Sequence, residues 1–136
     1  MMPTIEAFIA EGYSHRQKHD LIEAMTHAVV DAIDAPIDSI RVILNEVATH
    51  DAGIGGKTGA AISVAQAFLI AGRSIEQKRR LIAGLTVVMA ALPGVDSGGV
   101  RIIIKDIPNT DFGIAGQTAQ SLGRGIDRSA MAAAAR

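Results

Sequence analysis

The chain has 136 residues, with 13 Lys and Arg against 14 Asp and Glu, so we expect a single domain over residues 1–136 and no nucleic-acid partner. Hydrophobic residues make up 49% of the chain and aromatic residues 3%, which favours a core of aliphatic side chains. Because the chain has no cysteine, disulfides, thiolate zinc sites and a thiol nucleophile are excluded.

The first 14 residues, MMPTIEAFIAEGYS, lack the basic region of a secretory signal. We therefore expect a cytoplasmic protein. The apolar run at residues 85–92 is far shorter than the ~18 to 20 residues that cross a bilayer. It predicts a buried helix face, and no membrane partner is expected.

An internal repeat organises the chain. A shift of 60 residues aligns residues 3–56 with residues 63–116 without a gap, and 15 of the 54 pairs are identical. Two copies are too few for a solenoid, so the pattern indicates one supersecondary unit duplicated and fused. We expect two units, 3–56 and 63–116, joined by a linker at 57–62. The remaining residues, 117–136, are predicted to form a frayed tail or a short docking helix.

Each unit is predicted to begin with a strand, at Thr4–Ala10 and at Ser63–Ile70. A Ser-x-x-Gln pattern follows at Ser14 and at Ser74, and this pattern is typical of the capping box that starts a helix. Apolar residues then recur at helical spacing and predict one buried face per helix: Leu21, Ile22, Met25, Val29, Ala32 and Ile33 in the first, and Leu81, Ile82, Leu85, Val88, Met89 and Leu92 in the second.

The helices are expected to stop at Pro36 and at Pro93, and a second strand then begins near Ile40 and near Val100. Glycines at 51–56 (DAGIGG) and at 111–116 (DFGIAG) predict a small hairpin after each second strand. Each unit is therefore β-α-β, which favours parallel pairing of its two strands.

The predicted fold class is α+β, an α/β sandwich-like arrangement. In it, two tandem β-α-β units form a four-stranded sheet with two helices on one face. The other face is rich in Ile and Val and would be exposed in a monomer. We therefore expect a homotrimer packed sheet to sheet around a central axis.

Two weaker patterns point to ligands. His15 and His19 are four residues apart on a predicted helix, a spacing that can hold a metal, but their neighbours Arg16 and Lys18 favour a solvated polar face. The glycines at 53–56 follow a strand but lack the Lys-Ser/Thr of a phosphate loop. We therefore predict no metal site and no cofactor.

Several features taken in order carry a resemblance to a known family. They are Pro3 before the first strand, Gly12, the box at Ser14 and Gln17, Lys18, Leu21, Ile22, residues 34–36, residues 40–43 and the glycines at 53–56. Together they resemble 4-oxalocrotonate tautomerase, closely over the first 56 residues and more loosely over 63–116. The chain is thus similar to a fused, tandem member of the tautomerase superfamily, which implies a trimer like that of macrophage migration inhibitory factor.

The resemblance implies that an N-terminal proline, here Pro3, is the general base. An ordinary α-amine has a pKa near ~7.7 to 8, and nearby cations and an apolar pocket lower it toward neutrality. Such a base can take a proton from a carbon beside a carbonyl and return it elsewhere. Pro3 follows Met1 and Met2, so this role requires translation to start at Met2 and that methionine to be removed.

In the family, arginines hold the carboxylate and carbonyl oxygens of the substrate, and a phenylalanine helps to keep the pocket dry. The first unit keeps the proline, Pro3, and the strand arginine, Arg41. It has Tyr13 in place of the family's first arginine and Ala52 in place of the phenylalanine.

The second unit shows the complementary losses: Ser63 replaces the proline, but Arg73, Arg101 and Phe112 are kept. The resemblance therefore implies one complete site per chain, Pro3 with Arg73 and Phe112, and a strand arginine, Arg41 or Arg101, from a neighbouring chain. Without the resemblance, the arginines would be solvated or edge-guarding charges and Phe112 a packing residue.

The activity implied is that of a cofactor-independent isomerase of the 2-hydroxymuconate tautomerase type, acting in aromatic degradation on a small carboxylated enol or dienol. Relatives that dehalogenate 3-haloacrylates place an acidic residue two positions after the phenylalanine site, where this chain has Ile54 and Ile114. This difference favours tautomerisation. A catalytically decayed trimeric module for small-anion binding or assembly is the alternative.

Overall fold

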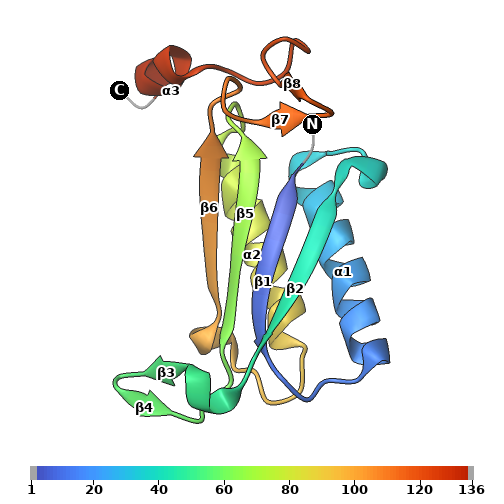
Figure 1. Ribbon diagram of the computed structural model, residues 1–136, viewed down its shortest axis with the longest axis vertical. Helices are drawn as coiled ribbons and strands as arrows, with labels where there is room; N and C mark the ends of the chain where they lie inside the picture. The colour runs from blue at the N-terminus through green and yellow to red at the C-terminus, as the bar shows by residue number, and fades with distance from the viewer. Residues whose placement is uncertain (1–2, 135–136) are drawn as a thin grey trace.

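The computed structural model describes residues 3–134, so the predicted removal of Met1 and Met2 lies outside the described residues. The first unit consists of β1 (Thr4–Ala10), α1 (His15–Ile33) and β2 (Arg41–Val47), and the second of β5 (Ser63–Ile70), α2 (Ile75–Ala90) and β6 (Arg101–Ile107). Within residues 3–134 these strands form a four-stranded sheet in the order β2-β1-β5-β6 (Figure 1).

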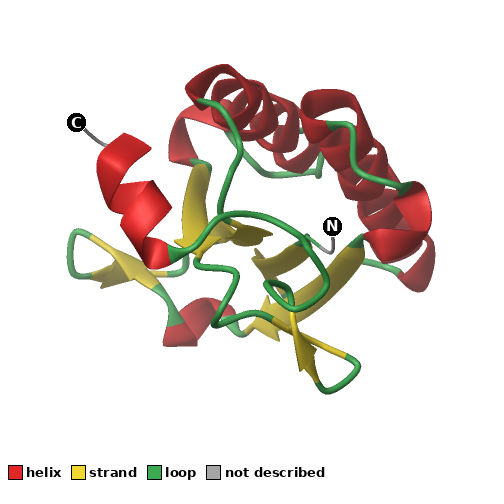
Figure 2. Ribbon diagram, turned by 90° about the horizontal axis from the view of Figure 1, so that it is seen from above, coloured by secondary structure: helices red, strands yellow, loops and turns green. Residues whose placement is uncertain are grey.

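Strand pairing follows the repeat. β1 and β2 are parallel, as are β5 and β6, whereas β1 and β5, which join the two units, are antiparallel. Figure 2 shows α1 and α2 on the same side of the sheet. The predicted fold class, with two β-α-β units and both helices on one face, is confirmed.

Both helices begin at the predicted capping boxes. The Ser14 hydroxyl accepts a hydrogen bond from the Gln17 N–H at 3.1 Å, and Gln17 Oε1 accepts one from the Ser14 N–H at 2.8 Å. Ser74 and Gln77 repeat the arrangement at 3.1 and 2.9 Å. Each reciprocal pair satisfies two N–H groups that a helix start leaves without partners.

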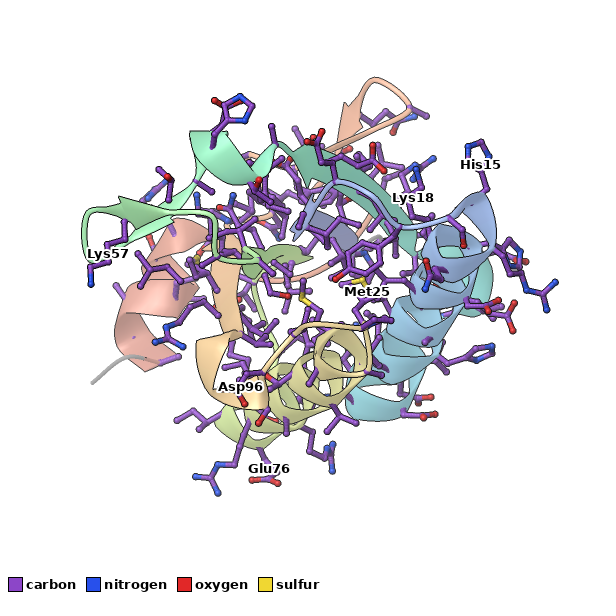
Figure 3. All side chains as sticks on the ribbon, turned by 90° about the horizontal axis from the view of Figure 1, so that it is seen from below. His15, Lys18, Met25, Lys57, Glu76 and Asp96 are labelled. Carbon is purple, nitrogen blue, oxygen red and sulfur yellow. The ribbon has the colours of Figure 1, made fainter. Side chains whose placement is uncertain are left out.

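An aliphatic core fills the space between the helices and the sheet. Its completely buried side chains come from both units and include Ile5, Ile9, Met25, Leu81, Leu85 and Met89. Figure 3 shows Met25 within this layer, and His15 and Glu76 pointing outward. Each unit thus supplies part of one shared core.

Two residues predicted to be buried are not. Ile22 is 38% exposed and Ile82 is 42% exposed, although both belong to apolar runs. Each follows a buried leucine, Leu21 or Leu81, and one residue turns a helix by about 100°, which carries the isoleucine off the core face. The prediction failed because Ile22 and Ile82 lie at the edge of the core face, where an apolar residue can still contact solvent.

The helix-free face of the sheet is less apolar than predicted. Since Ile5, Ala7 and Ile9 face the helices, alternation places their neighbours on the other face. By the same rule, that face carries apolar residues, Phe8, Ile43, Phe68 and Ile103, among polar ones, Glu6, Arg41, Gln66, Arg101 and Lys105. Lys105 Nζ lies 5.5 Å from the centre of the Phe68 ring.

Short elements complete the chain. A 3₁₀ turn precedes β2 (η1, Ile37–Ser39), another follows it (η2, Thr49–Asp51) and a third precedes β6 (η3, Ser97–Gly99). The predicted hairpins are β3 (Gly53–Ile54) with β4 (Lys57–Thr58), and β7 (Gly113–Ile114) with β8 (Gln117–Thr118). β4 and β8 fall where the sequence placed a linker and a tail, since two-residue strands leave no alternation to detect.

The segment after β8 is not a frayed tail. Ala119 is completely buried, and the last of the described residues form a short helix, α3 (Arg128–Ala134), as in the docking-helix alternative. Across residues 3–134, none of the helices combines the length and the apolar character that a membrane span requires.

Candidate functional site

The sheet has two ends that differ in chemistry. Thr4 pairs with Arg41 at the start of β2 and with Phe68 near the end of β5. Ile9, near the other end of β1, pairs with Ser63 at the start of β5. We call these the Pro3 end and the Ser63 end.

Pro3 directly precedes β1 and is buried. Its carbonyl oxygen accepts a hydrogen bond from the Arg41 N–H at 3.0 Å, which extends the β1–β2 ladder by one residue. Alternation places Pro3 on the same face as Ile5, the face that the helices cover. The proline therefore lies at the end of the sheet, on its helix side.

Arg73 brings a cation from the second unit to the Pro3 end. It lies in the loop between β5 and α2, directly after the end of β5 that pairs with the start of β1. Its Nη1 donates a hydrogen bond to the carbonyl oxygen of Ile33, the last residue of α1 in the first unit. Carbonyls at a helix C-terminus favour such a cation.

Burial acts on the charge of Arg73. It lowers the pKa of the guanidinium, and the nearby negative charge of Asp34 opposes this by raising it. Asp34 is held close to the last turn of α1, because it caps the helix in the left-handed conformation and donates its N–H to the Val30 carbonyl at 2.9 Å. Sequence reasoning included Asp34 only within residues 34–36 of the resemblance and missed its charge beside Arg73.

Phe112 is the third predicted group at this end. β6 runs parallel to β5 and ends at Ile107, opposite Ile70, so the loop that carries Phe112 starts from the Pro3 end. Phe112 is half-buried, and its carbonyl oxygen accepts a hydrogen bond from the Ala119 N–H at 2.9 Å. Figure 1 shows β7 and β8 at this end of the sheet and β3 and β4 at the other.

The two strand arginines are separated. Arg41 pairs with Thr4 at the Pro3 end, whereas Arg101 pairs with Val64 at the Ser63 end. Both are exposed and start from the helix-free face, opposite to that of Pro3. Arg101 Nη1 donates to the carbonyl oxygens of Gly98 and Val100, at 2.9 and 3.1 Å.

The Ser63 end holds the substituted residues. Ser63 is 2% exposed, and within the described residues its hydroxyl has no hydrogen-bond partner. Tyr13, where the first unit lacks the arginine, donates its hydroxyl to the Pro93 carbonyl at 2.6 Å. Ala52 follows η2 and supplies no ring. Within the described residues, these three positions supply neither an α-amine nor an arginine equivalent to Arg73.

The histidines do not assemble a metal site. His15 is exposed, and His19 Nδ1 lies 3.5 Å from the neighbouring Asp20 Oδ1. In the part of the chain that the structure describes, no group of three or more His, Asp or Glu residues is placed to hold a metal ion.

A cavity of about 380 Å³ opens beside Arg73, and sequence reasoning did not anticipate its lining. Its walls include Gly72 and Lys78 from the second unit, and Ile126 and Met131 from the C-terminal segment. The Lys78 ammonium is paired there with Asp106. Ile126 and Met131 lie in a segment with no counterpart in the first unit, so the repeat gave no signal for them.

Comparisons with known proteins agree with this architecture. A family model described as "Tautomerase enzyme" matches residues 3–61 and again residues 67–120. The 2-hydroxymuconate tautomerase of Pseudomonas putida is 43% identical over 56 residues, which are 41% of this chain and 89% of that protein. Because the family model matches twice, the resemblance and the duplicated unit are confirmed.

Two solved structures span both units. The F6 fused 4-OT, described as an asymmetric trimer, is 47% identical with a TM-score of 0.86 and covers 89% of this chain and 99% of its own. The Q0 fused 4-OT, described as a symmetric trimer, is 39% identical with a TM-score of 0.85 and the same coverage. Most of this chain therefore has the fold of these fused proteins.

Proposed function

The chain belongs to the tautomerase family, and we propose that it is a cofactor-independent isomerase that converts 2-hydroxydienoates or similar enol carboxylates to their keto forms. Pro3 is the general base, and Arg73 and Phe112 contact the substrate. One observation carries the proposal: the proline of the first unit and the arginine and phenylalanine loops of the second unit lie at the same end of the sheet. Each unit alone lacks part of this set.

In the ketonisation direction, the unprotonated Pro3 nitrogen accepts the proton of the 2-hydroxyl group. The C–O bond becomes a carbonyl, and the electron pair of the dienolate takes a proton back from the Pro3 ammonium at a diene carbon. The Arg73 guanidinium holds a carboxylate and stabilises the negative charge that develops. Phe112, half-buried beside this end, excludes water from the pocket.

We propose that a strand arginine completes the site from a neighbouring chain of a homotrimer. Arg41 and Arg101 both start from the helix-free face, where Ile43 and Ile103 are 50% and 47% exposed. An assembly that covers this face buries the isoleucines and carries an arginine to another chain. The F6 and Q0 fused proteins, which are described as trimers, support the proposal. Separate Arg41→Ala and Arg101→Ala variants tell which arginine acts.

2-Hydroxymuconate is the first substrate to test, because a 2-hydroxymuconate tautomerase is 43% identical over the first unit. This proposal places the enzyme in aromatic degradation in the cytoplasm. The second candidate, a decayed module that binds small anions, is favoured only by the Ser63 end, where a buried serine stands in place of the base.

The deciding experiment measures the intact mass and the ketonisation activity of the same sample. Untagged protein is expected to have a mass that begins at Pro3 and to ketonise 2-hydroxymuconate. A sample that keeps residues before Pro3 is expected to be inactive, because an amide nitrogen is not a base. Equal activity in both samples would overturn the role of Pro3. A free Pro3 with no turnover of any carboxylated enol would favour the binding module.

A further inference from the structure

Residues 121–134, which we call the strap, lie beyond the family-model match that ends at residue 120. We propose that the strap positions Arg73 and Phe112 for the Pro3 site, an inference that rests on the proposed function. The first unit has no such segment, since residues 59–62 lead from β4 directly into β5. Two anchors and one ion pair carry the inference.

The first anchor binds the loop that carries Arg73. The Ile126 N–H donates to the Ala71 carbonyl at 2.9 Å, and the Asn109 N–H donates to the Ile126 carbonyl at 2.9 Å. Ala71 itself donates its N–H to the Ile107 carbonyl at 2.8 Å. The strap therefore holds the backbone two residues before Arg73 and joins it to the loop that follows β6.

Close packing at Gly125 fixes the same loop. Gly125 has a φ of +67°, and a Cβ there would lie 2.2 Å from Ile70 Cγ2 and 2.9 Å from the Ala71 carbonyl oxygen. A Cβ at Gly72, directly before Arg73, would lie 3.8 Å from Gly125 Cα. The strap backbone thus lies against the loop backbone at a distance that only glycine permits.

The second anchor is the Asn109 side chain. Asn109 is 7% exposed, and its Nδ2 donates to the Arg124 carbonyl at 2.9 Å. At the matching position of the first unit, where no strap exists, the residue is Thr49. Asn109 therefore binds the strap, and the first unit, which has no strap, has a different residue at this position.

The strap also binds the loop of Phe112. Arg128 Nη2, on α3, lies 2.8 Å from Asp111 Oδ2, next to Phe112. These side chains are 75% and 48% exposed, so the pair by itself stabilises little. Together with the first anchor, it connects both loops that the second unit supplies to the Pro3 end.

Positioning of this kind matters for Arg73 because its side chain is long and flexible. Its guanidinium already donates to the Ile33 carbonyl across the two units. A displaced Ala71 would move the base of the Arg73 side chain relative to Pro3. Displacements near 1 Å can lower catalysis by about 100-fold.

The test compares two glycines of the strap in the full-length protein. Gly125→Ala introduces the contacts above, whereas Gly123→Ala has a similar φ of +71° and no atom within 4 Å of its Cβ. Gly125→Ala is expected to lower kcat/KM for 2-hydroxymuconate by about 10- to 100-fold. Amide exchange at residues 71–74 and 109–113 should become faster. Gly123→Ala should change neither quantity more than about twofold.

A double-mutant cycle separates positioning from general destabilisation. In an Arg73→Ala background, Gly125→Ala should lower kcat/KM by a smaller factor than it does in the native protein, because part of its effect acts through Arg73. Losses that multiply fully would overturn the inference. If Gly125→Ala does not fold, Asn109→Thr replaces it, since this variant removes the side-chain bond to the Arg124 carbonyl and takes the residue of the first unit, and it is expected to show the same changes at smaller size.

The outcomes also distinguish this inference from the proposed function. Unchanged exchange in Gly125→Ala, or faster exchange with unchanged kcat/KM, overturns the role of the strap while the isomerase activity stands. A native protein with free Pro3 and no ketonisation overturns the proposed function. In that case binding of a dicarboxylate, muconate, is the readout, and equal affinity in native protein and Gly125→Ala overturns the inference.

Discussion

At the Pro3 end, a proline, an arginine and a phenylalanine stand where the Ser63 end has a serine, a tyrosine and an alanine. Apart from the strap, some supporting contacts recur in both units. Lys18 and Glu46 form an ion pair at 2.6 Å in the first unit, and Lys78 pairs with Asp106 at the matching positions of the second. Between the units, the capping boxes and this ion pair recur, and the positions of Pro3, Arg73 and Phe112 differ. The strand arginine is present in both units, as Arg41 and Arg101.

Duplication allows two requirements of the proposed site to be met by different units. A single unit of this kind would have to supply the base and the groups that contact the substrate from one sequence. Here β1 and β5 pair in antiparallel fashion, so the start of one unit always meets the loop after the first strand of the other. Each unit can then keep only the groups that serve the Pro3 end.

The largest effect is expected from the base itself. A protein that keeps residues before Pro3 should lose about 10²- to 10⁴-fold in kcat/KM, because its proline nitrogen is an amide. Pro3→Ala should lower kcat/KM by a smaller factor, since a processed N-terminus still provides a primary amine as a base. At the matching position, Ser63→Ala should leave ketonisation unchanged. Steady-state kinetics on samples of verified mass measure all three, and a strong loss in Ser63→Ala would show that both ends take part.

The next largest loss of kcat/KM is expected when the positive charge of Arg73 is removed. Arg73→Ala should lower kcat/KM by about 10- to 100-fold, the worth of a hydrogen bond to a charged group. Arg73→Lys should restore part of this, because the positive charge remains. Arg79 is a matched control: its side chain is 75% exposed and lies 3.6 Å from Glu76 on the outer face of α2. Arg79→Ala should keep the native kinetics, and an equal loss in both variants would contradict a specific role for Arg73.

The fold could be predicted from the sequence because the signals that indicate its elements are short, and because they occur twice. The boxes at Ser14 and Ser74 and the strand at Thr4–Ala10 depend on near neighbours in sequence, and the alignment at a shift of 60 residues shows the same signals twice. The repeat does not say that β1 pairs with β5, so the sequence joined Pro3 with Arg73 only through the family resemblance. In the structure this pairing brings the two to one end of the sheet.

The parts that sequence reasoning missed depend on contacts between distant segments. Gly125 looks like any turn glycine until Ile70 is found against it. Burial of Arg73 against the Ile33 carbonyl requires α1 and the β5–α2 loop to be placed together first. Ile22 looked buried because a run of apolar residues does not say where a helix face ends.

A smaller and equal effect is expected at the two capping boxes. Ser14→Ala and Ser74→Ala should each lower the free energy of unfolding by about 1 kcal/mol, because each removes the acceptor of one helix N–H. Denaturant unfolding at one fixed protein concentration measures both, since an oligomer's stability depends on concentration. Unequal losses would contradict the view that the two units share one supporting structure.

The smallest expected effect is a change in the free energy of unfolding, which has opposite signs at two buried serines, Ser63 and Ser39. Ser63 has a hydroxyl without a partner in residues 3–134, so Ser63→Ala should raise the free energy of unfolding, by up to about 1 kcal/mol. Ser39 is 9% exposed and donates to the Pro36 carbonyl at 2.6 Å, so Ser39→Ala should lower it by about 1 kcal/mol. If Ser63→Ala is instead destabilising, its hydroxyl is bonded by a neighbouring chain, and the Ser63 end then serves assembly.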